Sequence, residues 1–166
     1  MRFEKAFVPD GVVTYGSQTH PADGHAGLIV TGEERARGMG DGNGVVLLLA
    51  TGFALVGKAR IPRAPVPAAR AALKDAGMEV EDVDAIKPHN PFAVNDVYYS
   101  RETGVHVKGM NEYGSSLDFG HPQGPTGARL IAELTEQLRM RGGGVGLFTG
   151  SAAGCTWAAL VPRVED

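Results

Sequence analysis

The chain has 166 residues, enough for one domain with a substantial hydrophobic core. Hydrophobic residues make up 43% and charged residues 21%, which is ordinary for a soluble globular protein, and the net charge of −3 gives no electrostatic case for binding nucleic acid. No apolar run is long enough to cross a membrane, and no signal peptide is predicted. The single cysteine, Cys155, excludes an internal disulfide and fits a reducing, cytoplasmic location.

The chain opens with a predicted extended segment over residues 1–24, and one domain is predicted over residues 25–166. The apolar run His25–Thr31 predicts a first strand. Thr31 and Glu34 then form a capping-box pattern, in which the threonine caps a helix and the glutamate reaches back to it. The domain is therefore expected to start with a strand and a short helix.

The middle of the chain alternates between strand and helix patterns. Val45–Val56 is the longest apolar run and predicts a buried strand. A helix pattern begins near Pro67, because proline suits a first helical turn, and it ends at Gly77. Val83–Ile86 predicts a short strand that delivers His89 to its carboxyl end, where α/β sheets place ligand-contacting residues.

Another helix is predicted after this strand, since Asn90 is a good capping residue and Pro91 suits the first helical position. This helix is expected to run to about Glu102. Near the C-terminus, Val145–Thr149 and Thr156–Val164 are typical of a closing pair of strands. Strands that alternate with helices predict a layered α/β domain.

A loop rich in glycine and proline places His121 immediately before a well-patterned helix. Pro122 and Pro125 stiffen the loop around the histidine. The helix carries a core-facing apolar stripe made of Leu130, Ile131, Leu134 and Leu138. A helix N-terminus disfavours a charged imidazole, so the position suits a neutral general base or a hydrogen-bond donor. Position alone also leaves open a structural role, the more common one for a histidine near a helix start.

Four segments of the sequence resemble the thiolase superfamily. Asn111–Ser115 followed by Gly120–Arg129 resembles the thiolase pattern N-x-x-G-G and then GHPxGx[ST]GAR. His89–Phe92 resembles the NEAF motif with histidine in its leading position, as in sterol-carrier-protein-type thiolases. Pro65–Arg70 resembles the PVPAxR helix start, and Pro21–Val30 resembles the NDGAAA segment. The resemblance implies a thiolase-like C-terminal half over residues 25–166, a layered α/β/α fold with a mixed sheet.

The resemblance also implies site residues. His121 is implied to deprotonate a nucleophilic cysteine and to help bind the thioester oxyanion, and His89 is implied to contribute to an oxyanion hole. The implied substrate-binding residues are Gly120, Gly124, Asn111, Tyr113 and Gly150. No metal site is expected, because the histidines at positions 20 and 25 have no carboxylate or cysteine at a zinc spacing.

The run Thr149–Gly154 resembles the thiolase CxGGG loop, with Ser151 in the cysteine slot. In thiolases this second cysteine is the base that forms the acetyl carbanion. An aliphatic hydroxyl has no titratable role there without a strong activating base, although it can still donate a hydrogen bond. Cys155 lies four residues farther on and is expected to be a small buried hydrophobe.

The match covers only the C-terminal half of a thiolase, whereas the acyl-accepting cysteine of the family lies in the N-terminal half. The resemblance therefore implies a subunit of a split thiolase-like acyltransferase of lipid metabolism, acting on acyl-CoA thioesters in Claisen condensation or thiolytic cleavage. A thiolase N-terminal-half chain would supply the cysteine in a hetero-oligomer, and a zinc-ribbon and OB-fold accessory protein is a further partner by analogy. Coenzyme A is the implied substrate or product, with no tightly bound cofactor.

Two alternatives to this function stay open. One is an aldolase-type carbon–carbon lyase that cleaves a hydroxyacyl-CoA without a covalent acyl intermediate. The other is a non-catalytic scaffold subunit. The serine at position 151 favours both alternatives, and the two histidines argue against the scaffold.

Overall fold

The structure is a computed structural model, and it describes residue 6 and residues 8–39, 44–152 and 154–165. Residues 1–5 and 7 of the predicted extended segment lie outside the described part. Within that part, no helix combines the length and the apolar character needed to cross a membrane.

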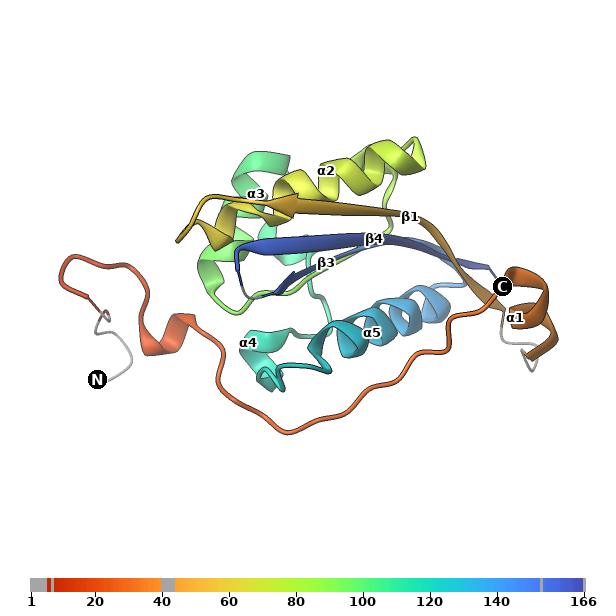
Figure 1. The fold of residues 1–166 in the computed structure, drawn as a ribbon, viewed down its shortest axis with the longest axis horizontal. Helices are drawn as coiled ribbons and strands as arrows, with labels where there is room; N and C mark the ends of the chain where they lie inside the picture. Colours follow the sequence, from red (N-terminus) through yellow and green to blue (C-terminus); the bar gives the residue numbers. More distant parts are fainter. Residues whose placement is uncertain (1–5, 7, 40–43, 153, 166) are drawn as a thin grey trace.

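The centre of the described fold is a mixed sheet of four strands in the order β1-β4-β3-β2 (Figure 1). The strands are β1 (Val45–Leu55), β2 (Ala85–Pro88), β3 (Gly144–Ala152) and β4 (Thr156–Glu165). Strand β4 runs antiparallel to both β1 and β3, whereas β2 runs parallel to β3. These four predicted strands are confirmed, although β2 starts two residues later than expected.

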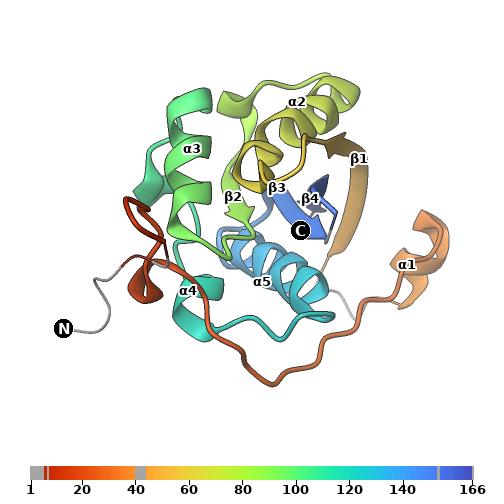
Figure 2. The same ribbon diagram turned by 60° about the vertical axis from the view of Figure 1, so that its left-hand side comes forward.

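Helices cover both faces of this sheet (Figure 1, Figure 2). On one face lie α2 (Pro65–Ala76) and α3 (Ala93–Thr103), and on the other lies α5 (Thr126–Met140). The remaining helices are α1 (Glu33–Met39) and α4 (Ser116–Phe119), and short 3-10 turns occur at Tyr15–Ser17, Ile61–Arg63, Val80–Asp82 and Val107–Gly109. The predicted α/β/α layering is confirmed.

Each face of the sheet has its own hydrophobic core. Helix α2 lies so close to β1 that a Cβ atom added to Gly52 would stand 2.3 Å from the carbonyl oxygen of Ala68. On the opposite face, Leu130, Leu134 and Leu138 of α5 are fully buried, as their spacing predicts. The two cores lie on opposite sides of β3 and β4, and His89 follows β2, the strand that pairs with β3.

The expectation that Val45–Val56 is a buried strand is wrong in one respect, because β1 lies at the edge of the sheet. Its side chains alternate between buried and exposed, and Phe53 is 76% exposed. An apolar run does not distinguish a central strand from an edge strand, because that difference depends on which strands lie beside it.

The predicted strand His25–Thr31 is also wrong. This segment is irregular and runs outside α5, away from the sheet (Figure 1, Figure 2). Leu28, Ile29 and Val30 are 45%, 79% and 88% exposed. A strand needs a neighbouring strand for its backbone hydrogen bonds, and the described residues place none beside this segment. The helix predicted next is confirmed as α1, but it begins at Glu33, so Gly32 precedes it instead of the predicted cap Thr31.

Candidate active site

The fold brings His89 and His121 together from different elements. His89 follows β2 directly, and its backbone N–H donates to the carbonyl oxygen of Thr149 on β3 at 2.7 Å. His121 lies in the loop between α4 and α5, and its backbone N–H donates to the carbonyl oxygen of His20 at 2.8 Å. The two imidazole centroids are 4.6 Å apart, with the rings tilted by 46°. Two separate predictions from the sequence thus meet in one place.

A hydroxyl group holds each imidazole through its Nδ1 atom. Nδ1 of His89 lies 2.9 Å from Oγ of Ser151 on β3. Nδ1 of His121 lies 2.7 Å from Oγ1 of Thr126, the first residue of α5. All three predicted catalytic residues therefore belong to one cluster, and Ser151 contacts His89 directly.

The cluster borders a cavity of about 360 Å³. Its walls are largely apolar and include the aromatic rings of Phe53, Phe148 and Trp157. The centroid of the Trp157 ring lies 6.4 Å from that of His89. A concave, mostly apolar site with a few convergent polar groups is the usual form of a small-molecule binding site.

Both histidines are held in the neutral form at neutral pH. Burial lowers the pKa of His89 from its ordinary value of 6.5 to about 4, and the nearby His121 and Arg129 act in the same direction. Burial also lowers the pKa of His121, again with help from Arg129. A neutral imidazole has one N–H that donates and one bare nitrogen that accepts a proton. Nε2 of His89 is buried and has no hydrogen-bond partner among the described residues, which is unusual for a buried polar atom.

Only part of the predicted substrate-binding set lies on this cavity. Gly124 and Gly150 line it, whereas Gly120, Asn111 and Tyr113 do not. The amide Nδ2 of Asn111 donates to the carbonyl oxygen of Pro88 at 3.1 Å, which ties its loop to the strand that carries His89, while Tyr113 is exposed. These contacts give Asn111 a structural part in the site.

The backbone conformation and the close packing at position 120 explain why a glycine stands there. Its backbone has φ +85° and ψ 177°, a conformation that residues with a Cβ rarely adopt. A Cβ atom added there would also stand 2.6 Å from Cβ of Ala22. The N-terminal segment therefore lies tightly against the loop of His121 and helps to hold it in place.

The predicted capping role of Asn90 is wrong. Helix α3 begins at Ala93, and Phe92 occupies its N-cap position. The amide Nδ2 of Asn90 instead donates to a carboxylate oxygen of Asp96 at 2.6 Å. Burial raises the pKa of Asp96 from 3.8 to about 6, although the Asn90 hydrogen bond opposes this shift and Asp118 adds to it. Because Asn90 directly follows His89, this buried pair ties the segment that carries His89 to helix α3.

A buried ion-pair network supports the loops around the cavity. Lys87 on β2 is fully buried, and its Nζ lies 2.9 Å from a carboxylate oxygen of Glu133 on α5 and 2.9 Å from the carbonyl oxygen of Gly114. Glu133 also pairs with Arg129 at 2.6 Å. The strand of His89 and the helix that follows His121 are thus joined by charge-assisted contacts.

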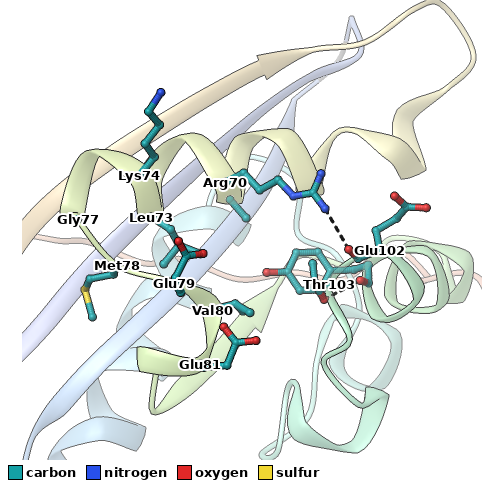
Figure 3. Close-up of a pocket in the computed structure, with 12 residues that line it drawn as sticks. Arg70, Leu73, Lys74, Gly77, Met78, Glu79, Val80, Glu81, Glu102 and Thr103 are labelled. Carbon is teal, nitrogen blue, oxygen red and sulfur yellow. Dashed lines mark hydrogen bonds between the residues drawn. The ribbon is translucent and has the colours of Figure 1, made fainter.

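A second cavity of about 430 Å³ lies between α2 and α3 (Figure 3). Arg70 lies on one wall and the carboxylates of Glu79 and Glu81 on another, and Arg70 donates to the backbone carbonyl of Glu102 at 3.0 Å. Tyr99 also borders this cavity, and burial raises the pKa of its phenol. Its charges are of mixed sign, and no histidine or cysteine lines it, so the smaller cavity is the better candidate for an active site.

Several cavity residues were missed by sequence reasoning. Phe53, Phe148 and Trp157 come from three different strands, and their convergence depends on the pairing of those strands. Thr126 belongs to the motif Gly120–Arg129, and its position five residues after His121 could have indicated that it lies at the site. Cys155 is buried, as expected, and is not part of the cavity wall. Within the described ranges, no group of three or more His, Cys, Asp or Glu side chains is placed to hold a metal ion.

Comparison with known proteins identifies the family that the sequence matches. A family model described as Thiolase, C-terminal domain, matches residues 46–163. The chain is 34% identical over 173 residues to a 3-ketoacyl-CoA thiolase of Shewanella woodyi, a match that covers 93% of this chain and 39% of that protein. A 3-ketoacyl-CoA thiolase of Shewanella sediminis is 33% identical with the same coverage.

Solved structures agree with the family match. The acetyl-CoA acetyltransferase of Bacillus anthracis superimposes with a TM-score of 0.89 at 28% identity, covering 98% of this chain and 41% of that chain. The human mitochondrial 3-ketoacyl-CoA thiolase superimposes with a TM-score of 0.83 at 23% identity, covering 99% and 42%, and this likeness shows the fold alone. The chain therefore spans 39% of the length of the first curated relatives that it matches.

Proposed function

The chain belongs to the thiolase family, as its C-terminal domain, and from that premise we propose that it is one subunit of a split thiolase-like enzyme. Its substrates are acyl-CoA thioesters, its reaction is Claisen condensation or thiolytic cleavage, and coenzyme A is a substrate or product. A thiolase N-terminal-half chain supplies the nucleophilic cysteine. The observation that carries this proposal is the pair His89 and His121, both neutral, on one apolar cavity whose described walls contain no thiol.

The two imidazoles suit thioester chemistry. Attack by a thiolate on a thioester places negative charge on the carbonyl oxygen, and an N–H donor beside that oxygen stabilises it. Nε2 of His89, which has no described partner, is available for this contact. His121 is available to act on the cysteine of the partner, either as a proton acceptor or as a hydrogen-bond donor. Which of these roles the resting ring fills depends on which of its nitrogens carries the hydrogen.

Exposed apolar residues support a partner chain. Phe53 lies on the rim of the cavity and is largely exposed, and so is the apolar run Leu28–Val30. Large apolar side chains in water are a common mark of a surface that another protein covers. An obligate interface of the proposed kind buries on the order of 2,000 Å² or more.

Reconstitution with a thiolase N-terminal-half chain tests the proposal. The chain alone is expected to show no thiolysis of a 3-ketoacyl-CoA, and the mixture is expected to form a stable complex with activity. The matched control is the same mixture in which the cysteine of the partner is replaced by alanine. Full activity of the chain alone, or equal activity with the control partner, would contradict the proposal. If the binary mixture assembles without activity, a zinc-ribbon and OB-fold protein is the third component to add.

Ser151 favours a second candidate function, the aldolase-type lyase. Its hydroxyl bonds to His89 and cannot ionise near neutral pH, so it does not replace the base that forms an acetyl carbanion. A retro-aldol cleavage needs a base that takes the proton from the β-hydroxyl group. The carbon–carbon bond then breaks, leaving a carbonyl product and an acyl-CoA enolate that is protonated. The neutral histidine pair can serve this reaction without a covalent acyl intermediate, and the same pair argues against a non-catalytic scaffold.

The variant Ser151→Cys separates the two candidates, with Ser151→Ala as its control. If the complex is a thiolase, the added thiol is expected to increase deuterium exchange at the α-carbon of an acyl-CoA, because a thiol ionises near pH 8.5 or lower. If it is an aldolase-type lyase, the added thiol brings no condensation activity. Mass spectrometry of the complex supplies an independent result, since only a thiolase forms an acyl group on the partner's cysteine.

A further inference from the structure

The hydrogen bond between Thr126 and His121 has a direction that the surrounding structure decides. Oγ1 of Thr126 lies 2.7 Å from Nδ1 of His121, and Thr126 is 2% exposed. The described residues provide no other hydrogen-bond partner for this hydroxyl. A buried donor without an acceptor is costly, so the hydroxyl hydrogen has to be directed at the imidazole nitrogen.

Electrostatics around the histidine favour the same direction. Thr126 begins α5, a helix of fifteen residues, and the free N–H groups of its first turn create a positive potential. Burial, and after it the positive charge of Arg129 one turn later, lowers the pKa of His121, although Arg129 is itself paired with Glu133. The helix terminus and Arg129 both disfavour a hydrogen on the ring nitrogen that faces the helix.

We propose that Thr126 is a positioning residue that donates its hydroxyl hydrogen to Nδ1 of His121 and thereby holds the ring in the tautomer with N–H at Nε2. In this tautomer the N–H belongs to the nitrogen on the far side of the ring from α5. The ring itself lines the cavity, and Gly124 and Gly127 border the same space without side chains. The resting imidazole is thus a preset hydrogen-bond donor.

The mechanistic meaning of this tautomer rests on the proposed function, whereas the tautomer itself does not. In the proposed complex, the thiol of the partner's cysteine releases its proton to solvent, and the Nε2–H group of His121 donates to the resulting thiolate sulfur and stabilises it. When the thiolate attacks, the charge moves from sulfur to the carbonyl oxygen, and the same N–H stabilises the new oxyanion. His121 then promotes the reaction without first accepting a proton.

Nitrogen NMR of the ¹⁵N-labelled chain tests the proposal without any activity assay. Two-bond proton–nitrogen correlations identify which ring nitrogen of His121 carries the hydrogen, and a His121→Gln spectrum assigns the signals. The parent chain is expected to show N–H at Nε2 and a hydrogen-bonded, bare Nδ1. Thr126→Ser retains the hydroxyl and is expected to give the same pattern. Thr126→Val keeps the shape but lacks the hydroxyl, so the Nδ1 signal is expected to move toward that of an imine nitrogen without a hydrogen bond.

Two results would overturn the proposal. One is a hydrogen on Nδ1 in the parent chain at neutral pH. The other is an Nδ1 signal that is the same in Thr126→Val and in the parent, with circular dichroism showing that the valine variant is folded. If the expected tautomer is found but the reconstituted complex does not need His121, the proposed function fails and the role of Thr126 in fixing the ring stands.

Discussion

The cavity between α2 and α3 and the cavity at the histidine pair are similar in size, at about 430 and 360 Å³. Each is bordered by a titratable side chain whose pKa is shifted mainly by burial, Tyr99 in the first and His89 in the second. A phenol is already neutral at pH 7, and the raised pKa of Tyr99 only makes it harder to ionise. The lowered pKa of His89 changes the protonation of a group that would otherwise titrate near neutral pH.

The comparison shows that neither size nor a shifted pKa alone identifies a catalytic cavity. The histidine cavity combines the shift with a second imidazole at 4.6 Å and a hydroxyl on each ring. The other cavity has an arginine that is already bonded to a backbone carbonyl and carboxylates on the opposite wall. What distinguishes the candidate active site is the convergence of groups that exchange protons.

The largest expected effect belongs to the histidine cavity. His121→Ala is expected to lower the rate of acyl transfer in the reconstituted complex by roughly 10²–10⁴-fold, because the variant loses a group that contacts the reacting atoms. Assembly should not change, since the packing of this segment comes from α5. Steady-state kinetics and analytical ultracentrifugation check both points. A complex that turns over at the parent rate would place the chemistry elsewhere.

His89 predicts a pH dependence of stability. Its pKa is about 4 in the folded chain and 6.5 in the unfolded chain, so unfolding takes up a proton between these values. The free energy of unfolding therefore keeps the full contribution of the neutral His89 above pH 6.5. It falls by about 3 kcal/mol as the pH drops toward 4. Denaturant unfolding from pH 7.5 to 4 measures this loss. His89→Gln has no such group, and an equal slope for variant and parent would show that another group causes the loss.

Asp96, on helix α3 beside the first cavity, predicts the opposite trend for stability with pH. Its pKa is raised to about 6, so the folded chain holds a proton that the unfolded chain releases above pH 3.8. Stability is therefore lost as the pH rises from 3.8 through 6, by about 2–3 kcal/mol. Asp96→Asn is expected to stabilise the chain by that amount at pH 7.5 and by little at pH 4. An equal gain at both values would mean that Asp96 is not buried in its neutral form.

A substitution at Gly120, the residue before His121, is predicted to have a smaller effect on stability. Gly120→Ala is expected to lower the free energy of unfolding by about 2 kcal/mol, because its backbone conformation disfavours a Cβ and the added atom meets Ala22. Gly124→Ala is the matched control from the same loop, since an added Cβ there meets nothing within 4 Å. Thermal unfolding compares the two variants. Equal melting temperatures would contradict the close contact between the loop and the N-terminal segment.

The smallest effect is expected at the other cavity. Arg70→Ala removes an exposed hydrogen bond to the carbonyl of Glu102 and should change the free energy of unfolding by less than about 1 kcal/mol. Activity of the reconstituted complex should remain within about twofold of the parent. A loss comparable to that of His121→Ala would remove the functional distinction between the two cavities.

The sequence predicted local patterns well and long-range arrangement less well. The spacing of Leu130, Leu134 and Leu138 specifies which side of α5 is buried, because that pattern belongs to a single helix. The run His25–Thr31 has the composition of a strand, but a strand forms only where another strand can pair with it. Asn90 has the residue type of a helix cap, yet its amide bonds to Asp96 six residues later, which depends on how α3 sits against β2.

The residues of the candidate site also fall into those that local motifs predict and those that depend on the folded arrangement. His89, His121 and Ser151 were predicted through short motifs, and the structure brings them together. The aromatic walls were not predicted, since they come from strands far apart in the sequence. The distance between the Thr126 hydroxyl and His121 also depends on the folded shape of the loop, which the order of residues does not specify.

The position of β1 at the sheet edge has a practical consequence for handling the protein. Val45–Leu55 contains neither a charged residue nor a proline, the features that usually discourage an edge strand from pairing with strands of other molecules. Without a covering protein, concentrated solutions are expected to form β-rich aggregates that begin at this strand. A lysine in place of the exposed Leu48 would act as a gatekeeper, and it should improve the solubility of the chain while leaving the histidine cavity unchanged.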